Sequence, residues 1–451
     1  MVLVLTMVVL QSISFTNYAL TTKTTNIIQG SAPYLTFDGG RTRVTNTAAL
    51  LGISLSDGRR FTPTTTNSID NPIELPVAGQ SFNDIAMFIP TNTRSIGLSS
   101  LIGTPYNYWG DDDGDGQGVN GVTATGSLWV SIVDKNNQAV SRNEVLTICK
   151  APYQLTLSYG SGRLKTRYGV PNESRFTAGN AVYYINPKAA PAICFAKPYI
   201  NYRSNKGLSA AVWNPDKGFL TQSVTPSSYD LNFPTTGANN LYFDLDIGGN
   251  NQALSWAPVS HGGITATMTD STSTSVRVTL TGPVATPSQW RSDNPGQIAR
   301  PSLPQVFELV GRDSSGNAVV KYGFKLKQWF VNCGDYEAWS GATPWCTNIG
   351  YRTPKVLELT NASCSYSWCQ EAVGATPSSP DNTYRRHIGG GFFSEWGWLG
   401  RDSNFFIAGG GYRTADRNNT STITVEKYFS VEADGSVHGF STPPLEVCVY
   451  P

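Results

Sequence analysis

The chain carries little charge and no real excess of either sign. Only 14% of its 451 residues are charged, and 33 Lys and Arg against 32 Asp and Glu give a formal net charge of +1. A protein that binds a phosphate backbone needs a basic surface, so this balance argues against nucleic acid as a partner. Met is scarce, whereas Thr, Ser, Asn, Gly, Trp and Tyr are abundant. That composition is typical of secreted β proteins.

The sequence also lacks the motifs of common catalytic and fibrous proteins. Its three histidines, His261, His387 and His438, do not lie in HExxH, and no GxSxG or P-loop pattern occurs. Asp244 and Asp246 could be taken for the paired carboxylates of a glycosidase, but their alternation with Leu and Ile is what any half-exposed strand shows. Heptads and collagen-like repeats, which many fibres contain, are absent. We therefore expect a protein that is not an enzyme.

No apolar run approaches the roughly 18 residues that a transmembrane helix needs. The apolar start, MVLVLTMVVL, has the length of a signal peptide, but no Lys or Arg precedes Lys23 and the cleavage site near Ala19 is poor. Residues 1–20 are therefore either an export signal or an edge strand of a longer chain, because Val and Leu suit both.

Alternating apolar and polar residues predict strands through the first three quarters of the chain. Residues 127–132, 153–159 and 241–247 show this period of two, and turn residues interrupt the pattern about every ten positions. Such spacing is typical of β-sandwiches. We expect two related sandwich modules, at residues 21–160 and 161–326.

The pattern changes after Trp329. Thr353 and Pro354 precede an apolar cluster and predict a short helix, the stretch beyond Arg385 is rich in Gly and aromatic residues, and the chain closes with a strand at 445–451. These features predict a compact α+β module at residues 327–451.

The seven cysteines indicate an oxidising compartment. They are Cys149, Cys194, Cys333, Cys346, Cys364, Cys369 and Cys448. None belongs to a paired CxxC arrangement with metal-ligand spacing, so disulfides are favoured over zinc. The odd number leaves one thiol over.

An acidic loop at residues 111–117 resembles the first half of a calcium-binding loop. Its candidate ligands are Asp111, Asp113, Asp115 and the backbone carbonyl of Gln117, with Gly116 at the sharp turn. Val122 stands where a helix–loop–helix site needs a bidentate Glu, so this is not a complete EF-hand. The loop is either a Ca²⁺ site completed from elsewhere or a solvated acidic turn.

Six phrases of the sequence resemble those of one protein family. WCTNIGYRTPKVLELT (345–360), RHIGGGFFSEWG (386–397) and VCVYP (447–451) look like the C-terminal module of enterobacterial invasin/intimin-type adhesins. APYLTFDG (32–39), WNPDKG (213–218) and FPTTGANNLYFDLDIG (233–248) resemble the adhesion domain of the same proteins. The resemblance covers nearly the whole chain after about residue 25.

The resemblance implies a bacterial cell-surface or secreted adhesin that binds a receptor, protein or glycan, on a host or neighbouring cell. Its expected fold is mainly β, with Ig-like sandwich modules followed by a separate C-type-lectin-like head at 327–451. In that fold a disulfide joins the first helix to the last strand, where Cys346 and Cys448 lie. Cys364 and Cys369 are close enough to pair locally, Cys149 with Cys194 would tie the β region, and Cys333 is left over. The calcium-binding signatures of sugar-binding lectins are absent from 327–451, so lectin-like shape does not imply sugar binding.

We expect the receptor contacts in the last loop region, because aromatic and Arg side chains are the usual anchors of interfaces. The candidates are Trp398, Arg401, Phe405, Phe406, Tyr412 and Arg413. Phe392, Phe393 and Trp396 belong to a family-like phrase and are expected in the core. The alternatives are a phage-type or fibre receptor-binding protein and, less favoured, a carbohydrate-active enzyme.

Overall fold

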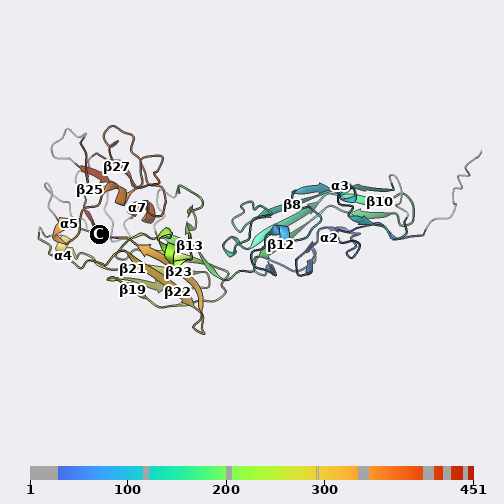
Figure 1. Ribbon diagram of the computed structural model, residues 1–451, viewed down its shortest axis with the longest axis horizontal. Helices are drawn as coiled ribbons and strands as arrows, with labels where there is room; N and C mark the ends of the chain where they lie inside the picture. The colour runs from blue at the N-terminus through green and yellow to red at the C-terminus, as the bar shows by residue number, and fades with distance from the viewer. Residues whose placement is uncertain are drawn as a thin grey trace, which may run out of the picture. The chain divides into compact units, whose positions relative to one another are not determined.

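The chain divides into two compact units, which are described one at a time. The computed structural model (Figure 1) describes residues 29–114, 121–199, 206–290, 292, 294–333, 345–399, 411–419, 428–439 and 445–451. The first unit contains the chain up to Leu146 together with Pro152–Asn186, and the second contains Thr147–Ala151 together with Pro187–Pro451. The expected segment 1–20 lies outside the described residues.

The fold class is mainly β, as the alternation of residue types predicted. In the described ranges, no helix has both the length and the apolar character that crossing a membrane requires.

A five-stranded sheet is the largest sheet of the first unit. Its order is β4 (Ile73–Glu74), β12 (Gly179–Asn186), β9 (Tyr153–Tyr159), β8 (Ser127–Val133) and β5 (Ser95–Gly97). Neighbouring strands are antiparallel except β12 and β4, which are parallel. Buried side chains alternate with more exposed ones along β8 and β9, because successive residues of a strand point to opposite faces.

Smaller sheets and short helices complete the described part of the first unit. The sheets are β11 (Glu173–Phe176), β10 (Gly162–Thr166) and β7 (Val122–Thr125); β1 (Tyr34–Leu35) and β6 (Trp109–Gly110); and β2 (Ile53–Ser54) and β3 (Arg60–Phe61). The helices are α2 (Thr47–Leu50), η1 (Phe82–Asp84) and α3 (Leu98–Ile102).

The first unit ends at Asn186 and not at residue 160, where the sequence predicted a boundary. The reason is strand pairing: β12 runs antiparallel to β9 from Gly179 opposite Tyr159 to Ile185 opposite Tyr153. Residues 162–186 thus complete the sheets of the first unit. Residue alternation predicts that a strand exists but does not say which strand it pairs with.

The second unit begins with a β-sandwich. One sheet has the order β14 (Trp213–Asn214), β15 (Gly218–Leu220), β13 (Ala192–Pro198), β17 (Tyr242–Gly248), β21 (Ser275–Thr281), β20 (Ile264–Thr269) and β19 (Val259–His261). The other has the order β18 (Ser255–Trp256), β22 (Gln305–Arg312) and β23 (Ala318–Leu326). Phe243 of the first sheet packs against Phe324 of the second, with ring centroids 6.0 Å apart. Three short helices, η2 (Ile148–Lys150), η3 (Pro226–Leu231) and α4 (Pro287–Trp290), also belong to this unit.

In the described part of the C-terminal module, residues 327–451, there are two small sheets and three one-turn helices (Figure 1). The sheets are β16 (Thr236–Ala238), β24 (Gln328–Asn332) and β28 (Val447–Tyr450), in which β16 comes from the sandwich region, and β25 (Tyr412–Arg417), β26 (Tyr428–Val431) and β27 (Val437–His438). The helices are α5 (Trp345–Asn348), α6 (Val356–Leu359) and α7 (Phe392–Trp396). The predicted short helix after Pro354 is α6, and the predicted closing strand is β28.

One hydrophobic core runs from the sandwich into the C-terminal module. The ring of Phe233 lies 4.9 Å from that of Trp396 on α7, and the ring of Phe243 lies 6.3 Å from it. Phe392, Phe393 and Trp396 are buried in this core, as expected. The module is therefore not the separate head that the sequence suggested. Local patterns carry no information about packing between segments so far apart in the chain.

All three expected disulfides are present in the structure: Cys149–Cys194, Cys346–Cys448 and Cys364–Cys369. The second of them joins α5 to β28, with the two Cα atoms 5.3 Å apart. Cys333 belongs to none of these three disulfides; it is buried, and its thiol donates to the carbonyl oxygen of Glu446 at 2.9 Å.

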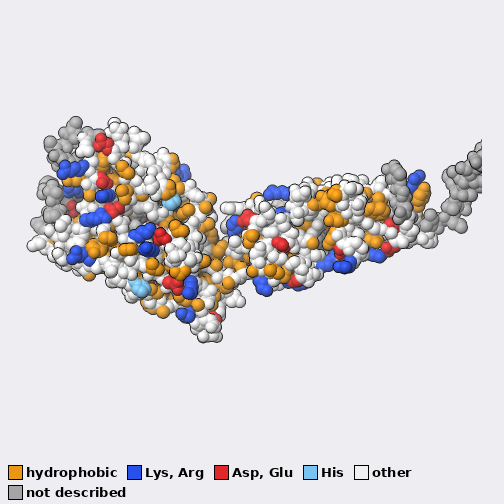
Figure 2. Space-filling view, in the orientation of Figure 1, with side chains coloured by type: hydrophobic (Ala, Val, Ile, Leu, Met, Phe, Trp, Pro, Cys, Tyr) orange, Lys and Arg blue, Asp and Glu red, His pale blue; other side chains and the backbone are white. Residues whose placement is uncertain are grey.

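Charged side chains are dispersed on the surface. Figure 2 shows Lys, Arg, Asp and Glu of the described residues scattered in small groups over the visible face of each unit. This distribution agrees with the formal net charge of +1.

Candidate functional site

A buried carboxylate organises the junction between the sandwich and the C-terminal module. Glu395 on α7 is 0% exposed. It accepts hydrogen bonds from the backbone N–H groups of Thr235 (3.0 Å), Thr236 (2.9 Å) and Gly389 (2.8 Å). The hydroxyls of Thr235 and Thr236 donate to it at 2.6 and 2.7 Å. A carboxylate held by this many donors is a structural anchor, because its lone pairs are already in use.

A buried guanidinium completes the junction. Arg386 Nη1 donates to the Glu395 carbonyl at 2.8 Å, and the guanidinium carbon lies 4.8 Å from the Trp213 ring centre. Burial lowers the pKa of the Arg386 guanidinium. Gly397 has φ +84°, and a Cβ there would lie 2.1 Å from Arg386 Nη2, so this position requires glycine. The junction fixes α7 rigidly on the sandwich.

The predicted contact residue Tyr412 belongs to the core and not to the surface. It is 2% exposed, and its ring centroid lies 5.3 Å from that of Phe393. Burial raises the pKa of its hydroxyl. The reason is the period of β25, which turns Tyr412 and Thr414 inward.

The other predicted contact residues are only partly within the described ranges. Trp398 is half-buried, and its backbone N–H donates to the Tyr384 hydroxyl at 3.2 Å. The Arg413 guanidinium carbon lies 4.6 Å from the ring centre of Tyr428. Outside the described residues lie Arg401, Phe405 and Phe406. A contact surface around 398–413 stays a prediction.

The structure brings three other aromatic rings together at the surface of the C-terminal module. Tyr366 is 56% exposed and Trp368 is 39% exposed. Their ring centroids are 5.1 Å apart with an interplanar angle of 4°, and the Trp368 ring stacks on His438 at 5.3 Å and 16°. We name Tyr366, Trp368 and His438 the aromatic ladder.

Covalent and polar contacts hold the aromatic ladder in place. The Cys364–Cys369 disulfide closes the short loop that carries both Tyr366 and Trp368. Asn418 Nδ2 donates to the carbonyls of Trp368 (3.4 Å) and Gly439 (3.1 Å), which ties this loop to the end of β27. A Cβ at Gly439 would lie 2.6 Å from the Trp368 carbonyl oxygen, so glycine permits this close approach. The rings are exposed and preorganised at the same time.

Polar groups surround the His438 end of the aromatic ladder. His438 Nε2 lies 3.1 Å from Ser436 Oγ and 3.4 Å from Glu432 Oε1. Two aromatic residues between cysteines that are only five positions apart are a feature from which part of the aromatic ladder could have been predicted. Nothing in the sequence indicated that His438 joins them, because it lies 70 positions beyond Trp368 in the chain.

Protein groups contact the described carboxylates of the acidic loop. Asp112 forms an ion pair with Arg43 and accepts from the Tyr34 hydroxyl at 3.2 Å, and Asp113 accepts from the backbone N–H of Ser31. The Arg43 pair relieves part of the repulsion among neighbouring carboxylates.

The donor set for Ca²⁺ is incomplete in the described part of this loop. Asp111 and Asp113 lie within it, whereas Asp115 and Gln117 lie outside the described residues. The ranges that the structure describes contain no group of three His, Cys, Asp or Glu side chains able to hold a metal ion. Calcium binding stays a prediction.

Comparisons with known proteins give two weak structural similarities. No family model matches the chain. No curated protein matches it either. The C-terminal 282-residue fragment of intimin, solved in complex with the intimin-binding domain of the translocated intimin receptor, is 10% identical with a TM-score of 0.30, covering 74% of this chain and 100% of that one. The D00-D0 domain of intimin is 8% identical with a TM-score of 0.20, covering 65% of this chain and 98% of that one. Similarities this low do not establish a family or a function.

Proposed function

We propose that the chain is an extracellular bacterial adhesin that binds a receptor on a host or neighbouring cell through its C-terminal module. The observation that carries this proposal is the aromatic ladder. Large aromatic side chains bury 150–250 Å² each when they are covered, so leaving Tyr366 and Trp368 in solvent forgoes a large hydrophobic contribution. A partner that covers the ladder recovers that contribution.

Rigidity supports a binding role for the aromatic ladder. Ordering a side chain during association costs about 0.5–1.5 kcal/mol, and the disulfide loop and the mutual stacking have already ordered these rings. Rigid aromatic anchors on a well-supported scaffold are the residues that dominate binding energy in many interfaces.

The buried ionisable groups of the junction support binding rather than catalysis. Glu395 and Arg386 are buried together, and their hydrogen bonds hold α7 on the sandwich. Both are 0% exposed, so a substrate in solvent does not reach them and neither is our candidate for a catalytic acid or base.

The disulfides support an extracellular location. Three disulfides in one chain are typical of proteins that fold in an oxidising compartment. The family-like phrases at 345–360 and 386–397 point to the same kind of protein.

Binding of the full chain to cultured host cells tests the proposal. Tyr366→Ala combined with Trp368→Ala should weaken binding at least about tenfold, which corresponds to about 1.4 kcal/mol. The matched control is Tyr168→Ala, because Tyr168 is a similarly exposed aromatic residue (51%) in the first unit. An unchanged melting temperature shows that the double variant is folded.

A folded double variant that binds as tightly as the parent chain would remove the aromatic ladder from the contact surface. Replacing residues 400–410 by a Gly/Ser segment tests the loop prediction in the same assay. Loss of binding on this replacement alone assigns the contact to the loop instead.

A further inference from the structure

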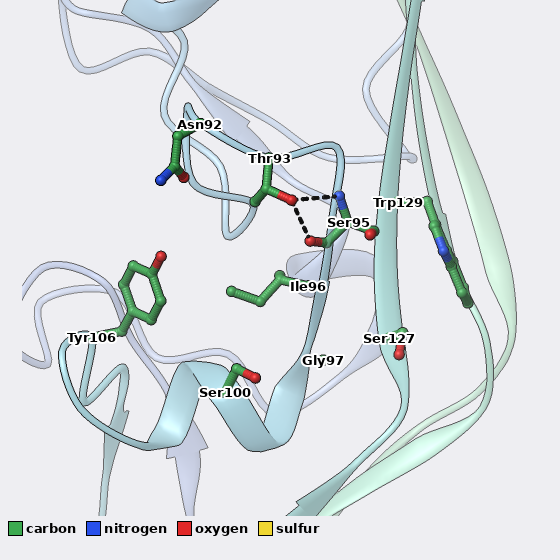
Figure 3. A pocket seen from close by; sticks show the side chains of 9 residues that line it. All are labelled: Asn92, Thr93, Ser95, Ile96, Gly97, Ser100, Tyr106, Ser127 and Trp129. Carbon is green, nitrogen blue, oxygen red and sulfur yellow. Dashed lines mark hydrogen bonds between the residues drawn. The ribbon is translucent and has the colours of Figure 1, made fainter.

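The first unit contains an open hollow beside the edge strand β5. Its volume is about 440 Å³, within the roughly 300–1,000 Å³ of small-molecule sites. It is lined by Asn92, Thr93, Ser95, Ile96, Gly97, Ser100, Tyr106, Ser127 and Trp129. Figure 3 shows the Tyr106 and Ile96 side chains on one side of β5 and the Trp129 indole on the other. Trp129 lies opposite Ser95, so these two side chains share one face of the sheet.

The chemistry of the lining is polar and uncharged. The nine residues supply hydroxyl groups, one carboxamide, an indole and a phenol, and none of the nine is Lys, Arg, Asp or Glu. Hydroxyls and amides both donate and accept hydrogen bonds, so they match a ligand that carries many hydroxyls of its own. A phosphate or carboxylate ligand would find no cationic side chain in this lining to balance its charge.

Trp129 is unusually exposed for a tryptophan in a regular sheet, at 47%. Its cross-strand neighbours are Ser95 on β5 and Ser158 on β9. A Cβ on Gly160 would come within 3.7 Å of the indole. Directly opposed side chains are the ones that normally cover an aromatic ring in a sheet. Small residues at these three positions leave the ring open.

The edge of β5 is unsuited to adding a peptide strand at Ser95. The Thr93 hydroxyl donates to the Ser95 carbonyl at 2.7 Å and accepts from the Ser95 N–H at 3.2 Å, as the dashed lines in Figure 3 show. Both backbone groups of Ser95 are therefore satisfied within the chain. Strand addition needs free edge groups, so this arrangement favours a small ligand over an extended peptide.

We propose that this hollow binds a neutral oligosaccharide, with one sugar ring stacked on the Trp129 indole. The apolar face of a sugar ring suits an open aromatic ring, and its hydroxyls suit the Ser, Thr, Tyr and Asn side chains around it. This site is independent of the aromatic ladder and of the proposed receptor contact.

Saturation-transfer NMR and calorimetry on the full chain test this site. The probes are lactose, cellobiose and diacetylchitobiose as neutral sugars, and sialyllactose as a charged counterpart. We expect at least one neutral sugar to bind with a Kd of about 1 mM or tighter, and Trp129→Ala to weaken it at least about tenfold. The matched control is Tyr168→Ala, another exposed aromatic residue of the first unit, which should leave sugar binding unchanged.

Several outcomes would overturn the proposal. They are no binding of any neutral probe at about 10 mM, roughly ten times the expected Kd; equal binding by a folded Trp129→Ala variant; loss of binding in a folded Tyr168→Ala variant; and tighter binding of sialyllactose than of lactose. If Trp129→Ala does not fold, Ser95→Ala and Ser127→Ala, which lie on the same face of the sheet as Trp129, replace it and should each weaken binding about two- to fivefold, the loss of one hydrogen bond. Equal binding by both of these variants would likewise overturn it.

Discussion

The two units of the chain are stabilised in different ways. All seven cysteines belong to the second unit, whereas the first contains none. The first unit has long paired strands, such as β8, β9 and β12 with seven or eight residues each. Helices of the C-terminal module have only four or five residues. Two of the disulfides and the Glu395 anchor therefore occur where regular hydrogen-bonded structure is sparse, whereas Cys149–Cys194 is attached to β13 of the seven-stranded sheet.

The same contrast holds for the two exposed tryptophans. Trp129 is presented by a regular sheet and stays open because its neighbours are small. Trp368 is presented by a short loop and stays in place because a disulfide and Asn418 hold that loop. A rigid support therefore holds each of these exposed tryptophans: paired strands in the first unit and a disulfide-closed loop in the second.

The largest expected effect comes from removing the disulfide between α5 and β28. Cys346→Ser with Cys448→Ser opens a link between residues 102 positions apart, and the chain-entropy model assigns about 4–5 kcal/mol to a loop of that size. Calorimetry should show the second unit melting at a much lower temperature and the first unit unchanged. Cys364→Ser with Cys369→Ser is the control, with a loss of roughly 2 kcal/mol for its much shorter loop. An equal decrease in the melting temperatures of both units would contradict this difference between them.

Removing the buried carboxylate of the junction should have the next largest effect. Glu395→Ala leaves the donors of Thr235, Thr236 and Gly389 buried without their acceptor, which should cost about 3–5 kcal/mol in the second unit. The control is Asp246→Ala, which removes a more exposed ion pair with Lys217 and should cost under about 1 kcal/mol. Urea unfolding measures both. Similar losses for the two variants would show that the junction is not the anchor.

A smaller effect concerns pH. Burial raises the pKa of the Glu446 carboxyl, partly offset by Arg413. A carboxyl whose folded pKa is raised favours the folded state below its unfolded pKa of about 4.3, and this contribution is lost as pH rises through the folded pKa. Glu446→Gln should therefore be more stable than the parent chain at pH 7, with the difference vanishing below about pH 4. Thermal melts at several pH values check this, and a difference independent of pH would contradict it.

The smallest expected effect is stabilisation of the first unit by a bound metal ion. If residues 111–117 bind Ca²⁺ with the weak affinity of extracellular sites, 1 mM Ca²⁺ should stabilise the first unit by about 1 kcal/mol. Asp113→Ala should abolish both this shift and the heat of binding in calorimetry. No heat with the parent chain would show that the loop is an acidic turn held by Arg43.

Local features of the fold were predictable from sequence, and long-range ones were not. Alternation at 127–132 and 153–159 correctly predicted strands β8 and β9, and Thr353-Pro354 correctly predicted α6. The boundary at residue 160 was wrong because the partner of β9 is β12, beyond it. Among the contact candidates, Tyr412 could not be distinguished from a surface aromatic, since loop and core aromatics look alike without the packing around them.

By itself the sequence determined the mainly β class and the resemblance to invasin/intimin-type adhesins, because these depend on composition, on a period of two and on short phrases. Tertiary structure alone decided that the C-terminal module shares a core with the sandwich, that Glu395 anchors it, and that Tyr366, Trp368 and His438 stack at the surface. The physical reason is distance along the chain. Contacts between residues tens to hundreds of positions apart depend on how strands pair and pack, and no local pattern records that choice.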